Sequence, residues 1–93
     1  MLVGLWVTDH ERYREYRAAM APVLARFGGG FGYDFVVSEV LESEVEAPIN
    51  RVFTLTFPDR RAREGFFADP EYVAARAAFF VPSVGHTTIL AEY

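Results

Sequence analysis

Residues 51–57 read RVFTLTF, and this short stretch decides the fold because apolar and polar residues alternate along it. Such alternation is typical of a half-buried β-strand. Phe53, Leu55 and Phe57 share one face of the predicted strand, whereas a valine and two threonines share the other. A strand with two unlike faces belongs to a sheet that is covered on one side and more open on the other.

Three further strands are expected around this stretch. Residues 2–7 form a short apolar run, residues 31–41 alternate in the same way, and residues 86–93 follow the last turn signals of the chain. The aromatic residues at odd positions of residues 31–41 are expected to share one face, because side chains alternate along a strand. The second and third strands should then pair as an antiparallel hairpin with a long loop.

Two helices are expected between these strands. The first should begin after a cap at Thr8, with Glu11 as its capping partner, and end near Phe27 before three glycines. Apolar residues at spacings of three and four mark its buried face: Tyr13, Tyr16, Met20, Val23, Leu24 and Phe27. The second helix should begin at Pro58 and restart at Asp69, where a proline and an acid follow the cap.

This order of elements is that of a ferredoxin-like βαββαβ sandwich, an α+β fold. We expect one domain over residues 1–93, with a four-stranded antiparallel sheet and two helices on one face. Hydrophobic residues make up 52% of the chain and aromatic residues 16%, which is more than so small a core buries. The open sheet face is therefore expected to pack against a second copy in a homodimer, and a ligand pocket is a further outlet for the surplus.

The composition excludes several classes of function. The net charge is −4 and the pI is about 5.0, so no nucleic acid is expected as a partner. The absence of cysteine excludes disulfides, thiol catalysis and cysteine-ligated metals. No apolar run approaches the roughly 20 residues that span a bilayer, so no membrane is expected as a partner, and a cytoplasmic location is expected.

A series of short motifs extends along nearly the whole chain: Thr8-Asp9, Tyr13 with Tyr16, the glycine pair before the second strand, Val40-Leu41-Glu42, Phe57-Pro58, and Phe67-Ala68-Asp69-Pro70-Glu71-Tyr72. Together they resemble the dimeric α/β-barrel superfamily, and most of all its domain-of-unknown-function 1330 family. The resemblance implies a ferredoxin-like protomer whose sheet packs face to face with that of a second copy. It implies no single activity, because members of the superfamily include cofactor-independent monooxygenases, haem enzymes, lactone isomerases and ligand-binding regulators.

Aromatic residues between the helices and the sheet indicate either a packed core or a ligand pocket. In a pocket, the ligand would be a small apolar or aromatic molecule, and the residues expected to bind it are Trp6, Tyr16, Asn50, Arg51 and Tyr72. His86 is the candidate catalytic residue, because an imidazole can transfer protons near neutral pH. The alternative for His86 is an exposed or hydrogen-bonded side chain with no chemical role.

Asp34 is a carboxylate in the middle of an apolar strand, and it needs a partner. If the second and third strands pair, Arg51 is that partner in a structural ion pair, and the alternative is an acid or base in a pocket. No set of His, Asp and Glu has metal-ligand spacing, so no metal is expected. No cofactor is expected either, and a haem bound by His86 is the weaker alternative.

Two functions remain open at this point. The first is a homodimeric α/β barrel with a small aromatic-lined pocket that acts as a cofactor-independent monooxygenase or isomerase. The second is a non-catalytic module for small-molecule binding or assembly. A cavity of roughly 300 Å³ or more with converging polar groups favours a site, whereas a filled core with Asp34 paired to Arg51 favours the module.

Overall fold

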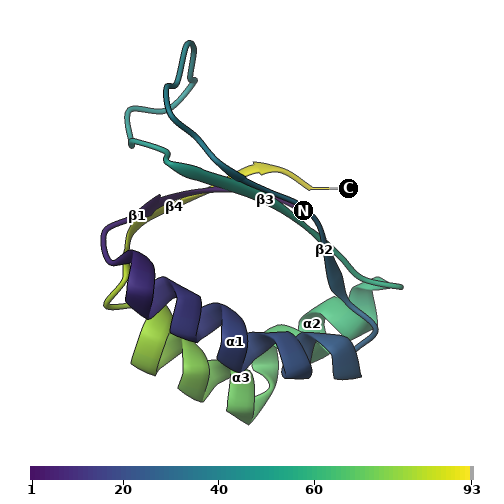
Figure 1. The fold of residues 1–93 in the computed structure, drawn as a ribbon. Coiled ribbons are helices and arrows are strands. Elements are labelled where there is room, and N and C mark those ends of the chain that lie inside the picture. Colours follow the sequence, from purple (N-terminus) through teal and green to yellow (C-terminus); the bar gives the residue numbers. More distant parts are fainter. Residues whose placement is uncertain (93) are drawn as a thin grey trace.

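The computed structural model describes residues 1–92 and confirms the expected α+β architecture. Figure 1 shows a sheet on one side of the molecule and a layer of helices on the other. The elements follow in the order β1 (Leu2–Val7), α1 (His10–Arg26), β2 (Gly30–Val36), β3 (Arg51–Thr56), α2 (Arg60–Ala68), α3 (Pro70–Ala75), a π-helical turn (Arg76–Phe80) and β4 (Val84–Ala91).

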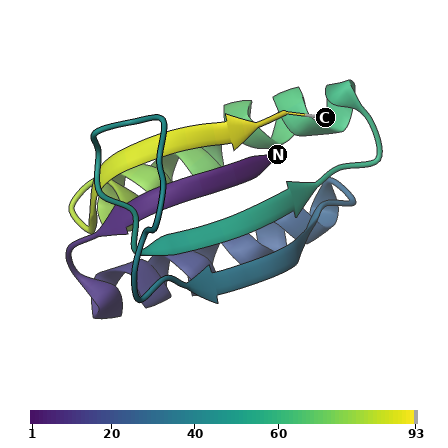
Figure 2. The same ribbon diagram turned by 90° about the horizontal axis from the view of Figure 1, so that it is seen from above.

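The strands form one antiparallel sheet in the order β2-β3-β1-β4, so β2 and β4 are its edges. The face that carries the helices is called the inner face below, and the opposite face is called the outer face. Figure 2 shows the long loop between β2 and β3 crossing over the outer face. Ile49 of this loop lies so close to Gly4 that a Cβ atom on residue 4 would come within 2.9 Å of it. The chain therefore covers part of its own outer face.

The core lies between α1 and the inner face of the two central strands. Phe53 and Leu55 of β3 are buried there together with the inward residues of β1, which confirms the face predicted for residues 51–57. Helix α1 contributes the buried residues that its spacing predicts: Tyr13, Tyr16, Met20, Val23 and Leu24. Phe66 of α2 and Tyr72 of α3 extend this core, with ring centroids 4.3 Å apart.

Strand β2 is shorter than residues 31–41, the range that the alternation predicts. It ends at Val36, and the last bond beside it runs from the Val37 nitrogen to the Asn50 oxygen at 2.8 Å. Because β3 begins at Arg51, the chain beyond residue 37 has no neighbouring strand to pair with. The prediction was wrong at this end because alternation is a local signal, whereas strand length depends on the partner.

A β-bulge in β2 reverses the facing of its aromatic residues. Between Phe31 and Asp34, β2 uses one residue more than β3, and the Tyr33 nitrogen donates to the Thr54 hydroxyl at 2.8 Å. Phe31 therefore lies on the inner face, with its ring 5.4 Å from that of a core phenylalanine, while Tyr33 and Phe35 stack on the outer face at 5.6 Å. The expectation that all three share one face was wrong.

Asp9 caps α1, and the prediction of Thr8 was wrong by one residue. The Asp9 carboxylate accepts a hydrogen bond from the Arg12 nitrogen at 3.0 Å. The Thr8 hydroxyl instead donates to the Ser83 carbonyl at 3.2 Å, which ties the end of β1 to the turn before β4. At the other end of the helix, Gly28 adopts a φ of 72°, the left-handed conformation expected just past a last helical turn.

The second helical segment is divided at Asp69, as the restart signal predicts. The Asp69 carboxylate accepts hydrogen bonds from two backbone nitrogens in the first turn of α3, at 2.9 and 3.3 Å. The π-helical turn that follows was not predicted: the Val81 nitrogen donates to the Arg76 oxygen, five residues earlier, at 2.9 Å. Strand β4 covers Val84–Ala91, so it begins before the predicted residue 86, while the predicted end at residue 93 lies outside the described residues. Among residues 1–92, no helix combines the length and apolar character needed to cross a membrane.

Truncation of Phe53 tests the assignment of the core face. Phe53→Ala should lower the free energy of unfolding by about 3–5 kcal/mol, because it leaves a cavity under α1. The control Val73→Ala, at a side chain that is 51% exposed on α3, should change it by less than about 0.5 kcal/mol. Urea denaturation measures both, and equal effects would mean that the inner face of β3 is not core.

Candidate functional site

A cavity of about 370 Å³ lies between the inner face of the sheet and the helices α1 and α3. Apolar side chains make up most of its walls, among them Val3, Leu5, Met20, Phe31, Phe53, Leu55, Phe67, Phe80 and Ile89. Polar groups come from Tyr13, Tyr16, Tyr72, Arg76 and Thr87. This volume, with a mostly apolar lining and a few polar groups, is typical of small-molecule sites.

The cavity lies where the helical segment of α3 and the π-helical turn faces the edge strand β4 and leaves space between them. Thr87 pairs with Leu5 and Ile89 pairs with Val3, so all four side chains point to the inner face. Val3 and Leu5 are buried beneath α1, but Ile89 stays 47% exposed. The inner side of β4 is therefore the rim through which solvent reaches the cavity.

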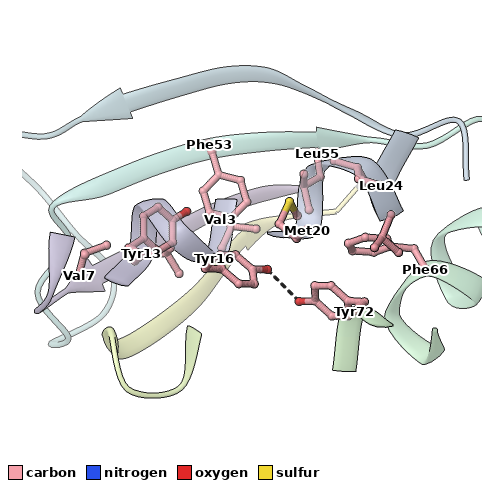
Figure 3. Close-up of a cluster of buried hydrophobic side chains, with 12 residues drawn as sticks. Val3, Val7, Tyr13, Tyr16, Met20, Leu24, Phe53, Leu55, Phe66 and Tyr72 are labelled. Carbon is pink, nitrogen blue, oxygen red and sulfur yellow. Dashed lines mark hydrogen bonds between the residues drawn. The ribbon is translucent and has the colours of Figure 1, made fainter. Parts of the chain in front are cut away.

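Two tyrosine hydroxyls meet at the wall of the cavity, as Figure 3 shows. Tyr16 of α1 and Tyr72 of α3 are both buried, and their Oη atoms lie 3.0 Å apart. Only one of the two hydroxyl protons can lie in this bond, so the pair retains one O–H for a further acceptor. Burial, and then the adjacent Tyr72 hydroxyl, raises the pKa of Tyr16. Tyr16 is therefore a neutral hydrogen-bond donor rather than a base.

Tyr13 brings a hydroxyl without a partner to the same cavity. It precedes Tyr16 by about one helical turn, with ring centroids 5.7 Å apart, and its Oη is buried with no hydrogen-bond partner among residues 1–92. Burial raises the pKa of Tyr13, whereas the neighbouring Arg17 guanidinium opposes this increase through its charge and by donating toward the hydroxyl oxygen. The hydroxyl proton itself has no acceptor among residues 1–92. An unbonded buried hydroxyl costs about 1–3 kcal/mol, which a ligand oxygen bonded to it would offset.

The π-helical turn places a cation at the cavity. Arg76 begins this turn, and its guanidinium carbon lies 5.1 Å from the centroid of the Phe80 ring. The Phe80 ring in turn lies 5.0 Å from that of Tyr16. Within residues 1–92, Arg76 makes no ion pair with a carboxylate. Because π-helical turns are frequent at functional sites, this turn adds to the case for a site here.

Asp34 lies outside the cavity, in an ion cluster with two arginines. Arg51 of β3 donates two hydrogen bonds to its carboxylate, at 2.7 and 2.9 Å, and Arg17 of α1 donates a third. Each guanidinium also lies over an aromatic ring, that of Arg17 at 3.5 Å from the Phe31 centroid and that of Arg51 at 5.1 Å from the Tyr13 centroid. The bonds from Arg51 hold the pKa of Asp34 below its usual range, although burial opposes them. The expected pair of Asp34 and Arg51 is thus formed.

Three other predicted site residues lie away from the cavity. Asn50 uses its side-chain amide to bond both the nitrogen and the oxygen of Val7, at 2.8 and 2.9 Å. Trp6 and His86 lie opposite one another in β1 and β4, on the outer face. In a single chain the sheet separates His86 from the tyrosine pair, so its catalytic role stays a prediction. No group of three His, Asp or Glu side chains in the described part of the chain is arranged to hold a metal.

Of the residues predicted to bind a ligand or act on it, the structure brings only Tyr16 and Tyr72 together at the cavity. Arg76, Thr87 and the unbonded hydroxyl of Tyr13 were missed. The spacing contains a signal for Arg76, which follows Tyr72 by four positions and so lies on the same side of the helical segment. No such signal exists for Thr87, because its facing depends on the register of β4 against β1.

A larger depression of about 580 Å³ near the N-terminus is a weaker candidate, because its polar groups serve the fold. The Asp59 carboxylate caps α2 by accepting from the Ala62 nitrogen at 2.7 Å. Arg63 lies 3.9 Å from Glu92, and the Met1 amine donates to a β3 carbonyl at 2.9 Å.

Comparisons with known proteins agree on the fold and assign no activity. The family model described as Domain of unknown function (DUF1330) matches residues 1–92. The crystal structure of RPA0582, a protein of unknown function from Rhodopseudomonas palustris, has a TM-score of 0.80 and 20% identity over 94% of this chain and 74% of that one. The methylated form of RPA0582 gives 0.78 and 19% over 94% and 73%. At these identities the likeness shows the fold alone, and no curated protein matches the chain.

Replacing Asp34 by Asn tests the ion cluster. At pH 7, Asp34→Asn should lower the free energy of unfolding by about 1 kcal/mol, because it leaves Arg17 and Arg51 side by side without a counter-charge while solvent partly screens the cluster. The lowered pKa of Asp34 means that its contribution is present above the pKa of an unfolded aspartate, about 3.9, and is lost as the pH falls through the folded value. The difference between wild type and variant should therefore shrink below about pH 4.

Urea denaturation at pH 7 and at pH values below 4 measures this difference. The control Glu64→Gln removes an exposed carboxylate from α2 and should change stability little at either pH. A difference for Asp34→Asn that stays constant over the whole range would contradict the assigned role of the carboxylate.

Proposed function

The chain belongs to the family described as Domain of unknown function (DUF1330), and we propose from its cavity that it binds a small, largely apolar molecule with an aromatic ring. The observation that carries this proposal is the 370 Å³ space under β4, with apolar walls and three bordering tyrosines. Each Å² of apolar surface buried there contributes about 25 cal/mol. A flat ring also suits walls formed by Tyr16 and Phe80, whose own rings meet at a tilt.

The polar groups of the cavity favour binding over catalysis. Its walls include no histidine and no carboxylate from the described residues, and burial raises the pKa of Tyr16 and of Tyr13. The cavity therefore offers hydrogen-bond donors but no general base suited to neutral pH. A monooxygenase or isomerase acting through His86 would need that residue at the ligand, and His86 lies on the outer face. The non-catalytic binding module is the function that we propose.

A neutral fluorescent probe tests the proposed binding. N-phenyl-1-naphthylamine, whose emission rises in apolar surroundings, should bind the wild-type protein saturably. Thr87→Trp should abolish most of this signal, because the indole fills the cavity from β4 and aromatic residues suit a strand. The control Ala74→Trp adds the same ring at an exposed position of α3, outside the cavity, and should bind like wild type. Equal binding by all three proteins would place the probe elsewhere and contradict the proposal.

We also propose that two chains associate through the outer face of the sheet. Tyr33 and Phe35 are 65% and 54% exposed on this face, although their rings stack on each other. Trp6 and Leu90 are exposed as well, and Leu41 of the crossing loop is the most exposed of them at 84%. Exposed aromatic and apolar groups gathered on one face are typical of interfaces, and a second copy supplies a matching face by two-fold symmetry.

Phe35→Glu tests the proposed homodimer. Light scattering coupled to size exclusion should give about twice the 10.5 kDa chain mass for wild type across a dilution series, and the single-chain mass for the variant. Phe35 is chosen because its side chain is exposed, whereas a change at Thr54, which also lies on the outer face, would remove the hydroxyl that accepts from the Tyr33 nitrogen. The control Val73→Glu places the same charge on the exposed face of α3 and should leave the mass unchanged. A monomeric wild type, or a dimeric Phe35→Glu, would show that this face is not the interface.

A further inference from the structure

We infer that the ligand of the cavity is an aromatic compound carrying an anionic oxygen group, a carboxylate or an enolate, an inference that rests on the proposed binding function. Three features of the cavity support this ligand class. Its polar side chains are donors, one of these donors is buried and unbonded, and another donor is a cation without a carboxylate partner.

The donors outnumber the acceptors around the cavity. Tyr13 and the pair of Tyr16 and Tyr72 offer hydroxyl protons, and the guanidinium of Arg76 can only donate. The Thr87 hydroxyl can act in either way. Within the described residues, no carboxylate, imidazole or side-chain amide borders the cavity. An amine or ammonium ligand would therefore find no matching anion here, whereas a ligand oxygen would find several donors.

The Tyr13 hydroxyl is the strongest indication that the ligand carries an oxygen atom. It is buried and unbonded among residues 1–92, although three charged groups lie nearby. Arg17 and Arg51 both bond the single carboxylate of Asp34, so none of the three groups accepts the Tyr13 proton. Buried donors without a partner are rare in folded proteins, and each one calls for an explanation. A ligand oxygen within reach of Tyr13 provides that explanation.

Arg76 supplies the charge that the anionic group would need. Arg76 lines the cavity, its guanidinium carbon lies 5.1 Å from the Phe80 ring centroid, and the Phe80 ring lies 5.0 Å from that of Tyr16. Arg76 is exposed and makes no ion pair with a carboxylate of the described residues, so its N–H groups are free to bind a ligand. A guanidinium can bind a carboxylate through two parallel N–H bonds. Arg17 and Arg51 are less suited to this role, since both already share Asp34.

Paired probes of equal shape test the charge preference. Isothermal titration calorimetry would compare 2-naphthoate with its neutral isostere 2-naphthamide, and both with naphthalene. Wild type should bind 2-naphthoate about tenfold more tightly than 2-naphthamide, as a difference of about 1.4 kcal/mol would give. Arg76→Met keeps the length of the side chain and should remove this preference while leaving the affinity for naphthalene unchanged. The control Arg14→Met makes the same change in net charge at an exposed position of α1 and should keep the preference.

Tyr13→Phe tests the second contact in the same assay. It should weaken the binding of the two probes that carry oxygen by about three- to tenfold and leave naphthalene unaffected, because it removes one hydroxyl from the wall. Thermal melting confirms that each variant is folded before titration.

The outcomes separate this inference from the proposed function. An equal affinity for 2-naphthoate and 2-naphthamide, or a preference that survives in Arg76→Met, would overturn the anionic ligand class while naphthalene binding still supported the cavity. Failure of all three probes to bind folded wild type would overturn the proposed binding function itself.

Discussion

The width of the helix layer is the constraint on which the rest of this structure depends. Helix α1 packs against the central strands, and the sheet extends beyond it on both sides. The inner face of the sheet differs between its two edge strands, β2 and β4. At β2, charge closes the inner face, because Asp34 joins an arginine of α1 to one of β3. At β4, Thr87 and Ile89 face inward toward α3 and the π-helical turn, and the space left between them is the cavity.

The ion cluster at β2 and the cavity at β4 both depend on local departures from regular structure. The β-bulge in β2 turns Asp34 to the inner face, where the α1 arginine reaches it, and turns Tyr33 and Phe35 outward to the proposed interface. The π-helical turn after α3 brings Phe80 and Arg76 toward Tyr16 at the cavity. Both irregularities therefore place the side chains on which the two proposals are based.

Most of the fold follows from patterns that are local in sequence. The alternation of residues 51–57, the apolar spacing of α1 and the restart at Asp69 are each set by neighbouring residues, and each is confirmed. The site depends on contacts between distant segments, which a single sequence does not reveal. Asn50 illustrates this. Its polarity had suggested ligand binding, but its side-chain amide bonds the Val7 backbone on the side of β1 that faces β3. His86 and Trp6 are a second example. The face of the sheet on which they lie depends on the register between β1 and β4, which the sequence alone does not reveal.

The central claim is that small apolar rings enter the inner cavity under β4. Intermolecular nuclear Overhauser effects between naphthalene and the methyl groups of the protein test this claim most directly. Naphthalene bound in the cavity should contact Leu5 and Met20, which line it. A second depression, on the outer face, is lined by Leu41 and Leu90 among others. Contacts confined to these two residues would contradict binding in the inner cavity, as would the absence of any contact.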